Sequence, residues 1–354
     1  MKVVLATGHA YPPQQVGGSE LSAHQLCLAL GERGMNVSVL ARWTWRHPTG
    51  PAYALAAATA RAGLICDKPF GYPVFRARDP GRAAAALVER IRPDIAVINA
   101  GEPMRMAQRF TSLGVPVLVY IRDGFFGELG GPVCKGPLTG YVTTSQALAA
   151  RIEDELGVTP VCIPPVVLPE FYRVETTRQA VTFVCPHPRK GLETAIALAA
   201  RRPDIPFLFQ ESWPIGLLPR RERDRRIAAL PNVTLLPRTL DMRPVYARTR
   251  LVLIPTPGYE AWGRVASEAQ VSGIPVLASN VGGLPEAVGP GGLVVDPGAD
   301  IDVWEAALSR LWDDEDEYRR LSAAALAHAA RPEFQPGALT DRLTAVIRAH
   351  AART

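Results

Sequence analysis

Short apolar runs alternate with amphipathic stretches along most of the chain. Runs rich in Val, Ile and Leu are too short for buried helices and predict strands, which in the first half fall at residues 3–7, 35–41, 95–99, 115–121, 141–144 and 161–163. Gly17 and Gly18 precede Ser19, a residue type favoured at N-caps, and Glu20 suits a first helical turn. A helix is therefore predicted from there to about Arg33, with another at residues 145–156.

The alternation of apolar runs and amphipathic stretches is interrupted around Pro164 and Pro169, and a linker is predicted up to Gln179. A second alternation follows, with strands at 181–185, 206–210, 233–236, 251–254 and 275–278, a helix at 191–200 and a last helix at 337–352. Strands alternating with helices indicate parallel sheets covered by helices on both faces. We therefore predict two Rossmann-like α/β domains flanking a cleft, at 1–168 and 169–336, with segment 337–354 packing back on the first. Residues 42–80 are less regular and are interpreted as a surface excursion.

Length and composition agree with this division. A chain of 354 residues suits two domains, and 47% hydrophobic with 21% charged residues is an ordinary globular balance. No apolar run approaches the roughly 18 residues that span a bilayer, and the N-terminal run is too short for a signal peptide, so a cytoplasmic protein is expected. Five widely spaced cysteines without a C-x-x-C pair argue against a disulfide framework or a zinc site.

The formal charge of +5 suits phosphate-bearing ligands or anionic surfaces. The basic residues are scattered arginines without a nucleic-acid motif, so no nucleic-acid partner is expected. Lysine is rare, because the chain has only Lys2, Lys68, Lys135 and Lys190.

Two carboxylates mark the most informative segment, residues 255–270. Glu260 comes just before a predicted helix and Glu268 lies eight residues later, so both can line one side of a pocket. The backbone N–H groups of Trp262, Gly263 and Arg264 at the helix start suit a diphosphate, and the carboxylates suit sugar or ribose hydroxyls. The alternatives are a first-turn dipole residue for Glu260 and a solvated helix face for Glu268.

Five motifs in register resemble the retaining glycosyltransferases of family four (glycosyl transferases group 1), which have the two-domain GT-B fold. They are the Glu-x₇-Glu pair, the Gly-x-Pro-Val strand from Gly273, the Gly-Gly-x-Pro-Glu loop from Gly282, the Gly17-to-Glu20 loop and Lys190-Gly191. The resemblance extends over nearly the whole chain and is strongest at residues 251–297.

The resemblance implies a role for each matching position. Glu260 would contact donor-sugar hydroxyls, Glu268 the ribose, and Lys190 the leaving diphosphate; a plain surface lysine is the alternative for Lys190. The remaining donor-binding residues implied are Gly17, Gly18, Trp262, Gly263, Arg264, Gly283, Leu284, Arg238 and Thr239, the last two near the base.

The chemistry implied is transfer from a UDP- or GDP-sugar with retention, by a front-face mechanism in which the departing phosphate takes the acceptor's proton. No metal and no cofactor beyond the nucleotide-sugar co-substrate are expected. Glu260 is not expected to act as a nucleophile, unlike the carboxylate of a retaining hydrolase.

The chain departs from the family pattern at two places. Arg122-Asp123 stands where relatives have His-Asp, so Arg122 is a candidate for phosphate or acidic-acceptor contact, or for pairing with Asp123. Relatives also have Gly-Arg shortly before Lys-Gly, whereas here Arg189 or His187 would serve.

The acceptor is predicted to lie against Asp123, Phe125 and Phe126, together with Trp43 and Trp45, because aromatic faces stack on rings. Core aromatics under a loop, or a membrane patch, are the alternatives. The predicted partners are a nucleotide-sugar and a sugar, lipid-linked or secondary-metabolite acceptor, while peripheral membrane contact and a homodimer stay open. A catalytically silent GT-B nucleotide-sugar-binding partner subunit is the competing function, and a phosphorylase or epimerase is disfavoured.

Overall fold

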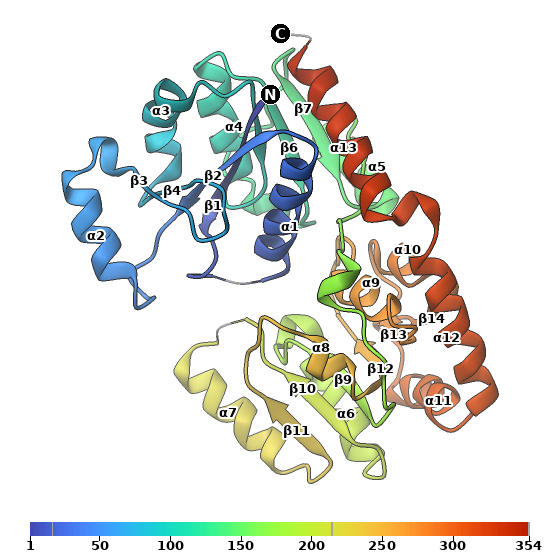
Figure 1. Cartoon of the computed structure of the whole chain (residues 1–354). Helices are drawn as coiled ribbons and strands as arrows, with labels where there is room; N and C mark the ends of the chain where they lie inside the picture. Colours follow the sequence, from blue (N-terminus) through green and yellow to red (C-terminus); the bar gives the residue numbers. More distant parts are fainter. Residues whose placement is uncertain (16, 214, 353–354) are drawn as a thin grey trace. The chain divides into compact units, whose positions relative to one another are not determined.

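The computed structural model describes residues 1–15, 17–213 and 215–352. The chain divides into two compact units, each an α/β structure (Figure 1). The first unit comprises Met1–Val166 together with the segment that begins at Pro336, and the second comprises Val167–Gln335. The α/β class and the parallel sheets predicted from the alternating pattern are confirmed.

Within the described residues, the first unit contains an eight-stranded sheet in the order β3-β4-β2-β1-β5-β6-β7-β8. Its strands are β1 (Lys2–Ala10), β2 (Asn36–Arg42), β3 (Ile65–Asp67), β4 (Val74–Ala77), β5 (Ile95–Ile98), β6 (Val117–Ile121), β7 (Thr139–Thr143) and β8 (Val161–Cys162). Its helices are α1 (Gly18–Glu32), α2 (Gly50–Thr59), α3 (Pro80–Ile91), α4 (Pro103–Ser112), α5 (Gln146–Leu156) and α13 (Pro336–Ala351). All neighbouring strands run parallel except β3 and β4, and β5 and β6 are buried along their whole length, as expected of a sheet covered on both faces.

The segment 42–80 corrects the sequence prediction, because it is not simply a surface excursion. It contains β4, which is buried at all four residues and pairs in parallel with β2 in the interior of the sheet. Pro73 precedes the strand and Arg76 interrupts its apolar pattern, so its four residues did not give a recognisable strand signal.

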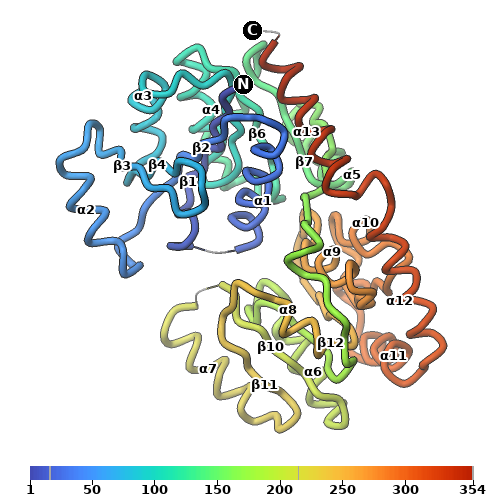
Figure 2. The backbone as a smooth tube through the Cα atoms, viewed as in Figure 1, coloured from blue at the N-terminus to red at the C-terminus, as the bar shows by residue number. Residues whose placement is uncertain are grey.

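The last helix, α13, packs on the first unit although all of the second unit precedes it in sequence (Figure 2). Arg33 at the end of α1 donates from Nε to Asp341 at 2.6 Å and from Nη2 to the Gly337 carbonyl at 3.0 Å. Arg342 donates to the carbonyl of Cys162 at 3.0 Å, at the end of β8. These contacts join α13 to the end of α1 and to β8.

The second unit has a sheet of six parallel strands in the order β11-β10-β9-β12-β13-β14, counted over the part of the chain that the structure describes. The strands are β9 (Ala180–Val184), β10 (Phe207–Gln210), β11 (Val233–Leu236), β12 (Thr249–Ile254), β13 (Val276–Ser279) and β14 (Gly292–Val295). The helices are α6 (Leu192–Arg201), α7 (Leu217–Ala228), α8 (Arg243–Tyr246), α9 (Arg264–Gln270), α10 (Leu284–Val288), α11 (Ile301–Trp312) and α12 (Glu315–Ala329).

The strand order reverses between β9 and β12. The chain moves outward from β9 to β10 and β11, and then returns to the other side of β9 to begin β12. In open parallel sheets, ligands bind beyond the carboxyl ends of the two strands at such a reversal. The loops after β9 and β12 are therefore the first place to look for a site in this unit.

Candidate functional site

Lys190 and Glu260 meet at this reversal point. Lys190 ends the 3₁₀ turn Pro188–Lys190 after β9, and Glu260 lies in the loop after β12. Lys190 Nζ is 2.5 Å from Glu260 Oε2, and the two side chains are 23% and 19% exposed. The two side chains singled out from the sequence as the centre of the site thus form an ion pair that solvent and ligands can reach.

Gly191 allows the loop after β9 to approach β12 closely. Its φ of +86° lies in the left-handed region, and a Cβ there would be 1.9 Å from the carbonyl oxygen of Pro255, just beyond β12. Only glycine fits both constraints. This close approach holds the neighbouring Lys190 against the segment that carries Glu260.

The loop after β13 is hydrogen-bonded to the same segment. The backbone N–H of Gly283 donates to the carbonyl of Glu260 at 2.8 Å. Gly282 has a φ of +53°, and a Cβ there would be 2.1 Å from the same carbonyl oxygen. Gly283 and Leu284, predicted to contact the donor, therefore lie directly beside Glu260, at the start of α10.

Glu268 is enclosed in the same unit, and each of its carboxylate oxygens accepts a hydrogen bond. Arg264 Nε donates to its Oε1 at 2.6 Å, and the Tyr246 hydroxyl donates to its Oε2 at 3.0 Å. Both side chains of the Arg264–Glu268 pair are 8% exposed, so the interpretation of Glu268 as a solvated helix face is wrong. Arg264 also donates from Nη2 to the hydroxyl of Tyr172 at 2.9 Å, so this cluster joins α9 to the start of the second unit. Burial raises the pKa of the Tyr246 hydroxyl well above its usual range, which keeps it a donor.

Trp262 and Gly263 form the entry to α9. The Trp262 ring is buried, stacks on Phe334 and donates from Nε1 to Ser267 at 3.0 Å, so any contact with a ligand there would be made by its backbone. Gly263 is the residue before α9 and has a φ of +86°.

The sequence did not predict that the rings of Trp213 and His187 lie close to each other and to Lys190. Lys190 Nζ lies 5.0 Å from the ring centroid of Trp213, in the loop after β10, and the His187 ring lies 5.7 Å from the same indole. Burial and the nearby cations Arg189 and Lys190 lower the pKa of His187, so its ring is neutral at neutral pH. A large apolar side chain in the loop after a predicted strand is the signal that could have drawn attention to Trp213, but the sequence analysis assigned it no role.

Arg238 and Thr239 follow β11, on the far side of β10 from the ion pair. Arg238 is exposed. The hydroxyl of Thr239 accepts a hydrogen bond from the backbone N–H of Asp241 at 3.1 Å, which folds a local turn there.

In the first unit, Gly17 is buried and directly precedes α1, whereas Gly18 is exposed and a Cβ there would meet nothing within 4 Å. The prediction of Ser19 as the N-cap is wrong, because Gly17 is the N-cap residue and Ser19 lies inside α1, where its hydroxyl accepts from the Asn99 side chain at 3.2 Å. Glu20 is buried and accepts from the Gln15 amide at 3.2 Å.

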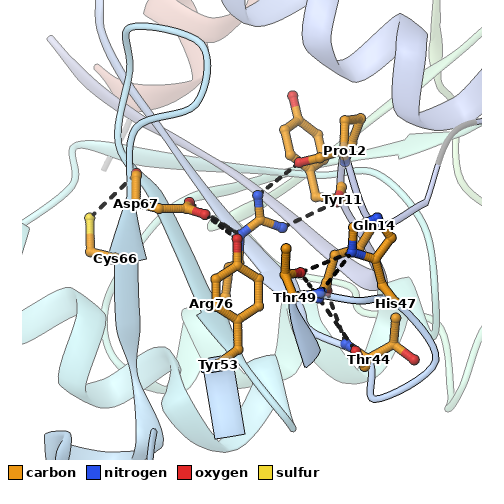
Figure 3. A network of polar contacts seen from close by, with 10 residues as sticks. All are labelled: Tyr11, Pro12, Gln14, Thr44, His47, Thr49, Tyr53, Cys66, Asp67 and Arg76. Carbon is orange, nitrogen blue, oxygen red and sulfur yellow. Dashed lines mark hydrogen bonds and ion pairs between the residues drawn. The ribbon is translucent and has the colours of Figure 1, made fainter. Parts of the chain in front are cut away.

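A buried arginine anchors the loop between β1 and α1 (Figure 3). Arg76, fully enclosed in β4, donates to the carbonyls of Tyr11 at 3.1 Å and Pro12 at 2.7 Å. Its Nε lies 3.0 Å from Asp67 Oδ2, which also accepts from the Tyr53 hydroxyl at 2.5 Å. The segment 42–80 therefore sets the path of the chain just before Gly17 and Gly18.

The predicted acceptor residues lie after β6. The guanidinium of Arg122 stacks 3.9 Å from the ring centroid of Tyr120, and Asp123 Oδ1 accepts from the N–H of Phe125 at 3.1 Å. Phe125 is 44% exposed, whereas Phe126 lies under the guanidinium of Arg151.

Trp43 and Trp45 contact each other edge to face, but only Trp45 is exposed.

Within the described residues, no helix combines the length and apolar character that crossing a membrane requires. Among the same residues, no three His, Cys, Asp or Glu side chains gather in a way that fits a metal ion.

Comparisons with known proteins give a consistent result. Residues 211–314 match the family described as glycosyl transferases group 1. A D-inositol 3-phosphate glycosyltransferase of Segniliparus rotundus is 34% identical over 188 residues, which is 50% of this chain and 41% of that protein. A protein of the same name from Corynebacterium diphtheriae is 42% identical over 117 residues, 31% of this chain and 26% of that one. The chain thus matches less than half the length of these curated relatives.

Solved structures share the fold over the whole chain. The sucrose-phosphate synthase of Thermosynechococcus elongatus superposes with a TM-score of 0.80, at 20% identity and full coverage of both chains. Anabaena HepE in complex with UDP-glucose gives 0.77, at 17% identity, with 98% of this chain and 99% of that chain covered. The predicted GT-B fold is confirmed by these similarities.

Proposed function

We propose that this chain, which belongs to the group 1 glycosyl transferases and has their GT-B fold, moves a sugar from a nucleoside-diphosphate sugar to an acceptor hydroxyl with retention of configuration. The observation that carries the proposal is the exposed Lys190–Glu260 pair at the reversal point of the second unit. A cation and a carboxylate side by side are what a diphosphate bonded to a sugar requires.

Lys190 is proposed to stabilise the leaving group. When the bond between the sugar's anomeric carbon and the diphosphate oxygen breaks, its electron pair passes to the diphosphate, and negative charge accumulates there. A preorganised ammonium lowers the energy of that charge without further rearrangement. Glu260, held beside it, fixes the position of Lys190 in the absence of donor and accepts hydrogen bonds from sugar hydroxyls in its presence.

Retention is proposed to follow from attack on the face that the diphosphate leaves. The acceptor oxygen bonds to the anomeric carbon, and the acceptor's proton passes to the departing phosphate oxygen. Glu260 is not proposed as a nucleophile for the alternative route, because in the presence of donor its carboxylate is occupied by hydrogen bonds from the sugar hydroxyls. A covalent glycosyl–Glu260 intermediate is therefore not part of the proposal.

The remaining donor contacts are proposed on the geometry around this pair. The backbone of Gly283 and Leu284 lies beside Glu260, and Arg238 and Thr239 lie on the opposite side of Lys190, toward the base. Glu268 is proposed to reach the ribose through the lone pairs that Arg264 and Tyr246 leave unused.

The acceptor is proposed to bind to the first unit at Arg122, Asp123, Phe125 and Phe126. An exposed phenylalanine and a guanidinium suit a sugar, lipid-linked or secondary-metabolite acceptor that carries a ring or a phosphate. The names of the relatives make UDP-glucose and D-inositol 3-phosphate the first donor and acceptor to try.

The test is a panel of UDP-, GDP-, ADP- and dTDP-sugars, with thermal stabilisation and release of nucleoside diphosphate as the readouts. Wild type is compared with Glu260→Gln and Lys190→Ala, and Lys68→Ala removes an exposed lysine of the first unit as a matched control. One donor should stabilise the wild type and turn over, and only the two site variants should lose turnover.

Two other results would change the proposal. Stabilisation by a donor without turnover in any acceptor mixture would favour a silent nucleotide-sugar-binding subunit, the function that the replacement of the family histidine by Arg122 favours. No response to any nucleotide-sugar would refute both functions.

A further inference from the structure

We infer that Trp213 is the surface on which the nucleobase of the donor stacks. The inference rests on the proposed function, because it takes a nucleoside-diphosphate sugar as the ligand. It concerns a residue to which no role was assigned from the sequence. Three features of the second unit support it: the order of the strands, the contacts of the indole, and the difference between Trp213 and Trp262.

The order of the strands determines the order in which the loop side chains lie along the carboxyl edge of the sheet. Moving from β11 to β13, the loops carry Arg238, Trp213, Lys190, Glu260 and Gly282 in that order. The diphosphate is proposed to bind at Lys190, near the middle of this row. In a nucleoside-diphosphate sugar the nucleoside and the sugar are attached to opposite ends of the diphosphate, so in an extended donor they lie on opposite sides of it.

The two sides of Lys190 differ chemically. On the β12 and β13 side lie the Glu260 carboxylate and the backbone of Gly283, which suit a ring of hydroxyls. On the β10 and β11 side lie the Trp213 indole and the Arg238 guanidinium, which suit a flat aromatic ring. The geometry therefore assigns the sugar to the first side and the base to the second.

The contacts of Trp213 place its ring next to the diphosphate position. Lys190 Nζ lies 5.0 Å from the ring centroid, and the His187 ring meets the indole at an interplanar angle of 67°. His187 is held in turn by the N–H of Arg189, which donates to its Nδ1 at 3.1 Å. These contacts orient the indole and leave 39% of the residue exposed.

Trp262 shows how a structural tryptophan of the same unit differs. It is 4% exposed, its Nε1 donates to Ser267, and its ring stacks on Phe334. Trp213 instead meets the His187 ring edge to face and is 39% exposed. Its exposed surface next to Lys190 is what a stacked base would cover.

The test compares binding of a nucleotide with binding of inorganic pyrophosphate, by isothermal titration calorimetry. The nucleotide is whichever of UDP, GDP, ADP and dTDP the wild type binds most tightly. Trp213→Ala should weaken nucleotide binding about tenfold to hundredfold, the usual size of a lost base–aromatic stack, and leave pyrophosphate binding within about twofold. Trp213→Phe should retain most of the nucleotide affinity, since a phenyl ring still stacks.

The controls separate the outcomes. Leu218→Ala removes another exposed apolar side chain of the second unit and should change neither affinity. Equal weakening of nucleotide and pyrophosphate in Trp213→Ala would show that Trp213 acts only by positioning Lys190, and would overturn the inference, as would unchanged nucleotide affinity. If the wild type binds none of the four nucleotides, it is the proposed function that fails, whatever the Trp213 variants do.

Discussion

The two units use charged side chains differently at equivalent places. In each, the first strand lies where the sheet order reverses: β1 between β2 and β5, and β9 between β10 and β12. The loop after β1 is held by Arg76, which is fully enclosed and donates to Asp67 and two backbone carbonyls. The loop after β9 carries Lys190, which is 23% exposed and forms its ion pair with Glu260.

This difference distinguishes a structural charge from one available for chemistry. A buried charge persists only when its partners satisfy it, so removing one partner is costly and there is little capacity left to bind a ligand. A partly exposed pair adds little to stability, since water and salt screen it, and it can exchange its partner for a ligand. The first unit thus uses its charge to shape a loop, and the second leaves its charge able to exchange partners.

Replacing Arg76 should have the largest effect on stability. Arg76→Met leaves Asp67 without its cation and two carbonyls without their donor, and should lower the free energy of unfolding by about 3–5 kcal/mol. Urea denaturation followed by circular dichroism measures this. Arg82→Met removes an exposed arginine of the same unit and should shift it by less than about 0.5 kcal/mol. A loss of similar size in both variants would mean that burial does not distinguish the two arginines.

Replacing Lys190 should show the opposite pattern. Lys190→Ala removes the cation proposed to stabilise the leaving diphosphate and should lower kcat about 10²–10³-fold. Its free energy of unfolding should change by less than about 1 kcal/mol, because the pair is partly exposed. Steady-state kinetics with the donor found in the panel and denaturation on the same sample give both values. A large loss of stability with kcat retained would remove the contrast between the units.

Substituting Gly191 tests whether the position of Lys190 matters as well as its charge. A Cβ at Gly191 would meet the carbonyl of Pro255 in a left-handed backbone, so Gly191→Ala should shift the loop and the Lys190 ammonium. Displacement of about 1 Å can cost about 10²-fold in rate, and a loss of that order is expected in kcat. Gly18→Ala, at a position open to solvent in the first unit, is the control for stability. Wild-type kcat in Gly191→Ala would contradict the role assigned to the close approach.

A smaller effect is expected from pH at helix α1 of the first unit, which carries His24. His24 accepts or donates a hydrogen bond with Tyr72 at 2.6 Å, and burial lowers its pKa below the usual 6.5. The unfolded chain therefore takes up the proton first as the pH falls below about 6.5, and the folded state loses stability there, by at most about 1.4 kcal/mol per pH unit. His24→Gln should flatten the fall in melting temperature between about pH 6.5 and 5 relative to wild type. An unchanged pH profile would show that His24 does not contribute to it.

Much of the second unit could be predicted because its signals are local. The strands before Lys190 and Glu260 are apolar runs bounded by Pro and Gly, and the spacing of the glycines and glutamates can be read directly from the sequence. The burial of Glu268 was not predictable, because its partners include Tyr246, which is 22 residues away in sequence and comes from α8. Whether a helix face is solvated depends on what packs against it, and hydrophobic periodicity does not report that.

The less predictable parts depend on distant partners. Arg76 lies in the segment interpreted from the sequence as a surface excursion, and its partners Tyr11 and Pro12 lie 65 and 64 residues away. A buried arginine is recognisable only once the carbonyls and the carboxylate around it are known. The proximity of Trp213 to Lys190 likewise depends on β10 lying beside β9, a pairing that no single segment shows.

The division of the first unit between the two ends of the sequence has a consequence for how the protein is made. The second unit is one continuous segment, whereas α13, which packs on the first unit, is synthesised only after all of the second. A nascent chain emerging from the ribosome can therefore complete the second unit before the first, in reverse of the usual order in which the N-terminal domain matures earliest. Until α13 arrives, Arg33 lacks the partners it has on that helix, and the apolar surface that the helix covers is open to chaperones and to neighbouring nascent chains.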